Sequence, residues 1–174
     1  MAFAKETGPP AYIAFYYQKT PVFENISLRT MYRARNLKDD KGESQIDDYA
    51  MSADELDAFE IFIKQAIYDA FDIVMKMTTS LTDPVFIDET ITIAAAPVTN
   101  AYGFNIFDEE AYNENNLYTT DDGIRKYIDA HIMTNWYDLV GHNDEYTKWL
   151  ARRDDARMEL ITRKLFQLRK PLLS

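Results

Sequence analysis

The chain has 174 residues, a formal net charge of −10 and 47% hydrophobic residues, which indicates one folded domain rather than a disordered chain. It has no cysteine, which excludes disulfides and thiolate metal sites and favours a reducing cytoplasm as the place of folding. Residues 1–20 lack a basic leader followed by an apolar run, and no stretch approaches the roughly 20 apolar residues of a membrane span. We therefore expect neither a signal peptide nor membrane contact.

The charge is unevenly distributed along the chain. Residues 148–170 contain eight basic and three acidic residues, a net of +5, so the rest of the chain carries −15. The overall acidity argues against general nucleic-acid binding. Two interpretations remain open, namely a solvated helix face beside an acidic domain, or an acidic body whose basic end docks a partner.

The first 50 residues are predicted to be irregular or partly extended, because Pro9, Pro10 and Pro21 interrupt a helix. An aromatic stretch over 12–23 is either a strand or short helix on the core, or an arm on a neighbouring subunit. We expect residues 1–27 to form an N-terminal arm. Its residues expected to contact a neighbouring subunit are Tyr12, Phe15, Tyr16, Tyr17 and Phe23.

A domain over 28–174 follows, and after a short basic helix its clearest element is a helix over 53–78. Ser52 and Glu55 have the spacing of a capping box. Apolar residues then recur every three or four positions, which predicts one buried helix face at the centre of the fold. These residues are Leu56, Phe59, Ile63, Ala66, Ala70, Val74 and Met77.

The segment over 84–107 changes character. Pro84 and Pro97 exclude a long helix, and β-branched residues alternate around Ile91 and Ile93. We predict a small antiparallel β-hairpin or three-stranded ribbon here. Because the edges of natural sheets are usually covered, we expect Ile91 and Ile93 to contact a neighbouring subunit.

Two further helices are predicted after an acidic, asparagine-rich loop. Thr120 is placed to cap a helix over 121–140, which Gly141 ends. Asn143 is placed to cap a helix over 144–169, and the short connection predicts an antiparallel helical hairpin. The predicted fold class is therefore mainly α, a helical bundle with a long central helix, a C-terminal helical hairpin and an inserted small β-hairpin.

The sequence shows no motif for catalysis or metal binding. His131 lies on the apolar face of its helix and is predicted to be a hydrogen-bonded core residue, and His142 a turn or cap residue. Their spacing is not that of a metal-ligand pair, and no glycine-rich phosphate loop or catalytic carboxylate pair is recognisable. We expect no catalytic residue, no metal and no cofactor. An enzyme that uses carboxylates without a recognisable motif stays open as an alternative.

The basic C-terminal helix is the remaining candidate site. Basic residues near a helix C-terminus are favoured by the helix dipole, so helix stability alone can explain them. The functional interpretation is a docking surface for an acidic partner. Its residues are Arg153, Arg157, Arg163, Lys164, Arg169 and Lys170.

Several segments together carry a family resemblance. They are RTMYRARN at 29–36 with MSADE at 51–55, the long helix with its β-insertion, and residues 136–141 followed by a helix ending RKLFQLRKP at 163–171. Over 28–171 the sequence resembles small structural proteins of tailed phages and prophages of Bacteroidetes, of the head–tail connector or adaptor (neck) kind. The aromatic N-terminal stretch does not match the family pattern.

The resemblance implies a virion structural protein without catalytic residues. It implies a homomeric ring, commonly dodecameric, assembled in the bacterial host cytoplasm and placed between portal and tail. The implied partners are other copies of the chain, the portal and the tail or neck proteins. An acidic lumen lets DNA pass without specific binding, because carboxylates repel phosphates. The alternative is a helical protein–protein interaction module or regulator without a virion role.

Overall fold

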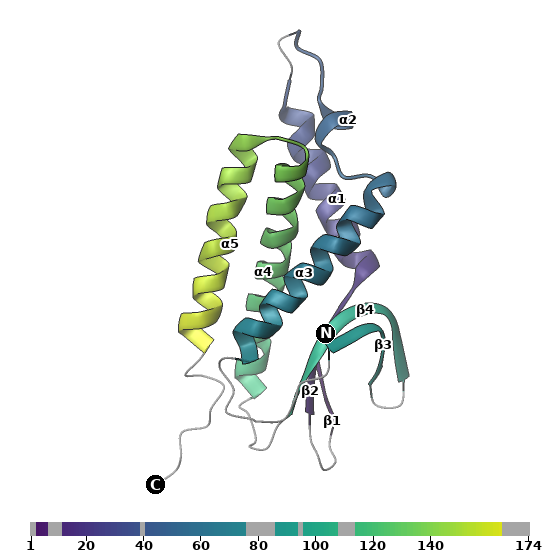
Figure 1. The fold of residues 1–174 in the computed structure, drawn as a ribbon, viewed down its shortest axis with the longest axis vertical. Coiled ribbons are helices and arrows are strands. Elements are labelled where there is room, and N and C mark those ends of the chain that lie inside the picture. Colours follow the sequence, from purple (N-terminus) through teal and green to yellow (C-terminus); the bar gives the residue numbers. More distant parts are fainter. Residues whose placement is uncertain are drawn as a thin grey trace.

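The computed structural model describes residues 3–6, 12–38, 41–75, 86–93, 96–107 and 114–164. Its long helices are α1 (Lys19–Asn36), α3 (Leu56–Met75), α4 (Glu114–Leu139) and α5 (Asn143–Lys164). Two short ones, α2 (Ile46–Tyr49) and the 3-10 turn η1 (Ala53–Glu55), connect α1 to α3. The strands are β1 (Phe3–Glu6), β2 (Tyr12–Gln18), β3 (Phe86–Ile93) and β4 (Ala96–Phe107). The predicted mainly α fold class, with a long central helix, a helical hairpin and an inserted β-hairpin, is confirmed (Figure 1).

The four strands form one sheet beside the helices, in the order β1-β2-β4-β3. All neighbouring strands are antiparallel, and β3 and β4 form the hairpin predicted within 84–107. The N-terminal strand β2 pairs with β4 along its whole length, from Tyr12 opposite Phe107 to Gln18 opposite Ala101. The aromatic N-terminal stretch is therefore part of the same sheet as the hairpin.

The structure corrects the prediction for the first 50 residues. Lys19–Asn36 is a regular helix, and Pro21 lies at its third position, where a backbone N–H has no intrahelical acceptor to lose. Val22 and Ile26 are buried on its inner face. The predicted boundary of an arm over 1–27 thus falls inside α1, because β2 and the first turns of α1 pack on the core of their own chain.

The start of the central helix agrees with the prediction. The Ser52 backbone N–H donates to Glu55 Oε2 at 2.7 Å, and the Asp54 N–H donates to the Ser52 hydroxyl at 3.3 Å. One 3-10 turn precedes α3, and Phe59 and Ile63 are buried as expected, whereas Leu56, predicted on the same face, is 44% exposed. The predicted continuation beyond Met75 lies outside the described residues.

Helix α4 begins earlier than predicted. Its first residue is Glu114, so Thr120 lies buried within the helix and is not its N-cap. Leu117 is also buried, and burial of this side chain stabilises a turn that polar residues alone would not. The predicted end is confirmed, because Gly141 follows α4 with a φ of +71°, as a C-terminal capping glycine does.

The cap of α5 is His142 and not Asn143. The His142 carbonyl accepts the Tyr146 N–H at 2.9 Å, and its Nδ1 accepts the Glu145 N–H at 3.4 Å. A side chain that accepts a hydrogen bond from the third helical N–H defines the N-cap position. The prediction that His142 is a turn or cap residue is confirmed, and Asn143 becomes the first residue of α5.

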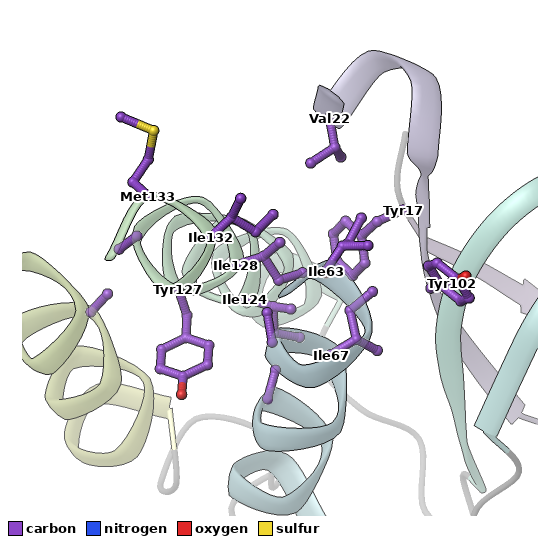
Figure 2. Packing of buried hydrophobic residues seen from close by; sticks show 14 of the residues in the cluster. Tyr17, Val22, Ile63, Ile67, Tyr102, Ile124, Tyr127, Ile128, Ile132 and Met133 are labelled. Atoms are coloured by element: carbon purple, nitrogen blue, oxygen red, sulfur yellow. The ribbon is translucent and has the colours of Figure 1, made fainter. Parts of the chain in front are cut away.

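The core lies where α3, α4 and the sheet meet. Figure 2 shows Ile124 and Ile128 of α4 directed toward Ile63 and Ile67 of α3, and all four side chains are buried. The sheet packs against α3 on its other side, where the ring centroids of Phe71 and Phe104 are 5.4 Å apart. The central position predicted for α3 follows from these contacts on two of its sides.

Candidate functional site

The first two residues of the predicted basic docking surface lie beside acidic residues of their own chain. Arg153 and Arg157 line a cavity of about 320 Å³ with Asp69, Asp72 and Asp154. Arg153 Nε lies 3.7 Å from Asp154 Oδ1. These carboxylates compensate part of the positive charge that was predicted to attract an acidic partner.

The other four residues of that prediction have side chains outside the description. Arg163 and Lys164 end α5, and Arg169 and Lys170 lie beyond the described residues. Of this set, the structure places the side chains of Arg153 and Arg157, which line one cavity.

His131 lies next to the same cavity but does not line it. Its side chain is buried, and its Nδ1 is 3.6 Å from Asp69 Oδ2, beyond hydrogen-bond distance. Neither ring nitrogen has a hydrogen-bond partner among the described residues, so the predicted burial is confirmed and the predicted hydrogen bonding is wrong. Burial lowers the pKa of His131, Asp69 opposes this change, and Arg153 adds to it.

Tyr127 completes this cluster. Its hydroxyl donates to Asp69 Oδ2 at 3.3 Å. Burial and the Asp69 carboxylate raise the pKa of Tyr127 to about 12, so the hydroxyl stays protonated at neutral pH. The Tyr127–Asp69 hydrogen bond and the proximity of His131 to Asp69 join α4 to α3.

Two aromatic residues that were predicted to contact a neighbouring subunit are buried in their own chain. The Phe15 ring centroid lies 5.5 Å from that of Phe104, and Phe15 is 1% exposed. The Tyr17 hydroxyl donates to Asp121 Oδ1 at 3.0 Å, and burial together with Asp121 raises the pKa of Tyr17 well above its ordinary value. Neither side chain is available to another subunit, because both are buried within their own chain.

The remaining residues of that prediction have mixed positions. Tyr16 is partly exposed, whereas Phe23 packs edge-on against Phe59 with ring centroids 5.2 Å apart. Tyr12, Ile91 and Ile93 lie on strands, but their side chains are outside the description. Within the described part of the chain, β3 pairs on one side only, with β4, so the strand that carries Ile91 and Ile93 is an edge strand.

A basic groove between α1 and α5 was not predicted as a site. Arg29, Arg33 and Asn36 of α1 and Trp149 and Arg152 of α5 line a cavity of about 430 Å³, together with Tyr32. The Arg152 guanidinium lies 4.4 Å from the Trp149 ring centroid, a cation–π contact. The sequence alone places Arg29, Arg33 and Asn36 on one face of a helix. It does not show that this face lies beside α5.

A buried carboxylate underlies this groove. Glu145 is 4% exposed, accepts a hydrogen bond from Lys148 Nζ at 2.8 Å, and has Oε2 3.8 Å from Arg33 Nε. Burial opposes its ionisation, but the Lys148 hydrogen bond and the Arg33 guanidinium outweigh burial and lower the pKa of Glu145. Arg29 forms a similar pair with Asp129 at 3.1 Å. Arg29 and Arg33 are therefore each paired with a carboxylate of the same chain.

Among the described residues, no three His, Asp or Glu side chains are arranged to hold a metal ion. In the same part of the chain no helix is long and apolar enough to cross a membrane. Comparisons with family models, curated proteins and solved structures find no match to this chain.

Proposed function

We propose that this protein is a virion structural protein, a head–tail connector or adaptor that forms a homomeric ring between portal and tail. The observation that carries the proposal is the β-hairpin inserted between α3 and α4, which ends the sheet in the edge strand β3. An edge strand presents backbone N–H and C=O groups that a second chain pairs with readily. A ring subunit is a setting in which such an edge is covered by a neighbouring copy.

The charge distribution supports the same proposal. The basic groove on α1 and α5 lies on a chain whose net charge is −10. A chain that carries surfaces of both signs is suited to head-to-tail contact between copies, and such heterologous contacts close into rings. The excess of carboxylates also suits a lumen through which DNA passes without specific binding.

The proposed partners are other copies of the chain, the portal protein and the tail or neck proteins. The role requires no catalytic residue, metal or cofactor. The β3 edge, with Ile91 and Ile93, is the proposed contact within the ring. Phe15 and Tyr17 are not part of the proposed contact, because both side chains are buried in their own chain.

The test is removal of the gene from a genome that produces particles. Particles without a connector should accumulate as DNA-filled heads and separate tails, and supplying the protein in trans should restore joined particles. Normal joined particles in the absence of the protein would instead favour the alternative, a helical interaction module or regulator without a virion role.

A further inference from the structure

The outward face of α1 combines apolar and basic side chains. Leu28 is 53% exposed, Met31 45% and Tyr32 67%. Arg35 is exposed on the same face, and the groove with Arg29, Arg33 and Arg152 adjoins it. Exposed large apolar side chains that are gathered on one helix and rimmed by charge are typical of a protein interface. Because Arg29 and Arg33 pair with Asp129 and Glu145, we define the basic surface by the remaining residues: Leu28, Met31, Tyr32, Arg35 and Arg152.

The segment that leads into α3 has the opposite charge. Residues 46–61 contain six acidic residues and no lysine or arginine. Two of the six have partners within the chain, since Glu55 completes the capping box and Glu60 accepts a hydrogen bond from Lys19 at 3.1 Å. The other four are exposed, and so are Leu56 at 44% and Ile61 at 56%. Four of these residues are on η1 and the start of α3, and we call them the acidic surface: Asp54, Leu56, Asp57 and Ile61.

The two surfaces are complementary in two respects. Each has exposed apolar side chains next to an exposed charge, since Arg35 lies one helical turn after Tyr32 and Asp57 lies one turn before Ile61. Burial of the apolar side chains supplies attraction without direction, whereas opposite charge fixes which surface meets which and disfavours self-pairing. Like charges would meet if the basic surface met its own copy, so the geometry favours a heterologous contact.

We infer that the basic surface of one copy binds the acidic surface of a second copy of this chain. The inference rests on the proposed ring, because it adds a second contact between neighbouring subunits to the one proposed at the β3 edge. It also names the surface that the basic side of α1 and α5 meets in the head-to-tail contact. In Figure 1, α3 lies nearer the viewer and α1 lies farther away. The acidic surface on α3 and the basic surface on α1 are therefore on different parts of one subunit. Each subunit therefore offers both halves of the contact.

Cross-linking tests the contact directly, because the natural chain has no cysteine. Two single-cysteine variants, Tyr32→Cys and Ile61→Cys, are mixed at equal concentration and treated with a short thiol-to-thiol reagent, both as concentrated isolated protein and in assembled particles. A product joining position 32 of one copy to position 61 of another is expected. A control pair with Leu139→Cys, also at an exposed position, should not cross-link with Tyr32→Cys. Absence of the 32–61 product in both preparations, or a dominant 32–32 product, would overturn the inference.

Charge exchange supplies a second measurement. The variant Arg35→Glu with Arg152→Glu, or the variant Asp54→Lys with Asp57→Lys, should each reduce the 32–61 product about tenfold, because like charges then meet. Copies that combine all four changes should recover the product, since complementarity is restored. Circular dichroism and thermal unfolding establish that each variant is folded. Unchanged cross-linking in both single-surface variants would contradict the inference.

Failure of this contact and failure of the connector role give different results. A ring of this protein in particles without the 32–61 product would reject the contact and keep the role. A 32–61 product in solution, with the protein absent from particles, would keep the contact and reject the role.

Discussion

The Thr30 hydroxyl on α1 accepts a hydrogen bond from the Met51 backbone N–H at 2.9 Å, and both residues are buried. The same hydroxyl donates to the Ser27 carbonyl at 2.9 Å, and the Ser27 hydroxyl donates to the Met51 carbonyl at 2.8 Å. These bonds hold the chain against α1 at the point where it turns into α3. The Thr30 hydroxyl therefore contributes to the placement of the segment that leads into the central helix.

Replacing Thr30 with valine keeps the side-chain shape but leaves the buried Met51 N–H without an acceptor. We expect Thr30→Val to lower the free energy of unfolding by about 1–3 kcal/mol, measured by chemical denaturation. Thr147→Val is the matched control, because the exposed Thr147 hydroxyl bonds only to the Asn143 carbonyl one turn earlier in α5. The control should change stability by less than about 0.5 kcal/mol. Equal effects of the two variants would contradict the role of Thr30.

His131 should make stability depend on pH. Burial lowers its pKa in the folded protein below the ordinary value of 6.5, so as pH falls below 6.5 the unfolded chain binds the proton first. The free energy of unfolding should therefore fall as pH decreases from 7.5 to 5.5, measured by denaturation at several pH values. His131→Gln should lose most of this dependence in that window. His142→Gln keeps His131 and should retain the pH dependence. If the free energy of unfolding of His131→Gln still falls with pH as in the natural chain, His131 is not its source.

Gly103 permits the close approach of β4 to β2. A Cβ at this position would overlap the Phe15 carbonyl oxygen and lie 2.9 Å from Tyr16 Cα. Because both obstacles are backbone atoms of a paired strand, Gly103→Ala should destabilise the protein by about 1–3 kcal/mol, as other overpacking substitutions do. Thr99→Ala, at an exposed position of β4, is the control. The unfolding temperatures of both variants are compared. An unchanged unfolding temperature for Gly103→Ala would show that β2 and β4 move apart to fit the methyl group without loss of stability.

The two faces of α3 provide a matched pair of core substitutions. Ile63 is fully buried, whereas Ile61 is 56% exposed on the same helix. Ile63→Ala should cost about 2–5 kcal/mol in chemical denaturation, because a cavity remains among α3, α4 and the sheet. Ile61→Ala removes the same atoms and should cost less than about 0.5 kcal/mol. The reverse order would show that the helix presents the other face to the core.

Local signals predicted much of the fold. The capping box at Ser52, the apolar period of α3 and the glycine after α4 are each set by residues close in sequence. Where a distant partner decides the structure, the predictions failed or left alternatives open. Tyr12–Gln18 was predicted as a strand, a short helix or an arm, and it is a strand because β4, about 90 residues farther along the chain, pairs with it. Helix α1 tolerates Pro21 at its third position, and this position could be recognised only once its start at Lys19 was known.

The same limit applied to the candidate site. A run of positive charge marked Arg153 and Arg157 in the sequence, but Asp69 and Asp72 of α3 come close to them only in the fold. The groove between α1 and α5 joins residues more than 100 positions apart, so no spacing along the chain reveals it. On α5 the apolar side chain of Met158 is 53% exposed, whereas Trp149, Ala156 and Leu160 are buried, so apolar character alone does not identify the buried face.

Electron cryo-microscopy of intact particles from a host that carries the gene tests the proposed homomeric ring between portal and tail. We expect a ring at the neck into which the helices α3, α4 and α5 and the sheet of this structure fit, with the β3 edge covered by a neighbouring copy. A neck fully accounted for by other proteins, with this chain absent from the particle, would rule out the proposed ring.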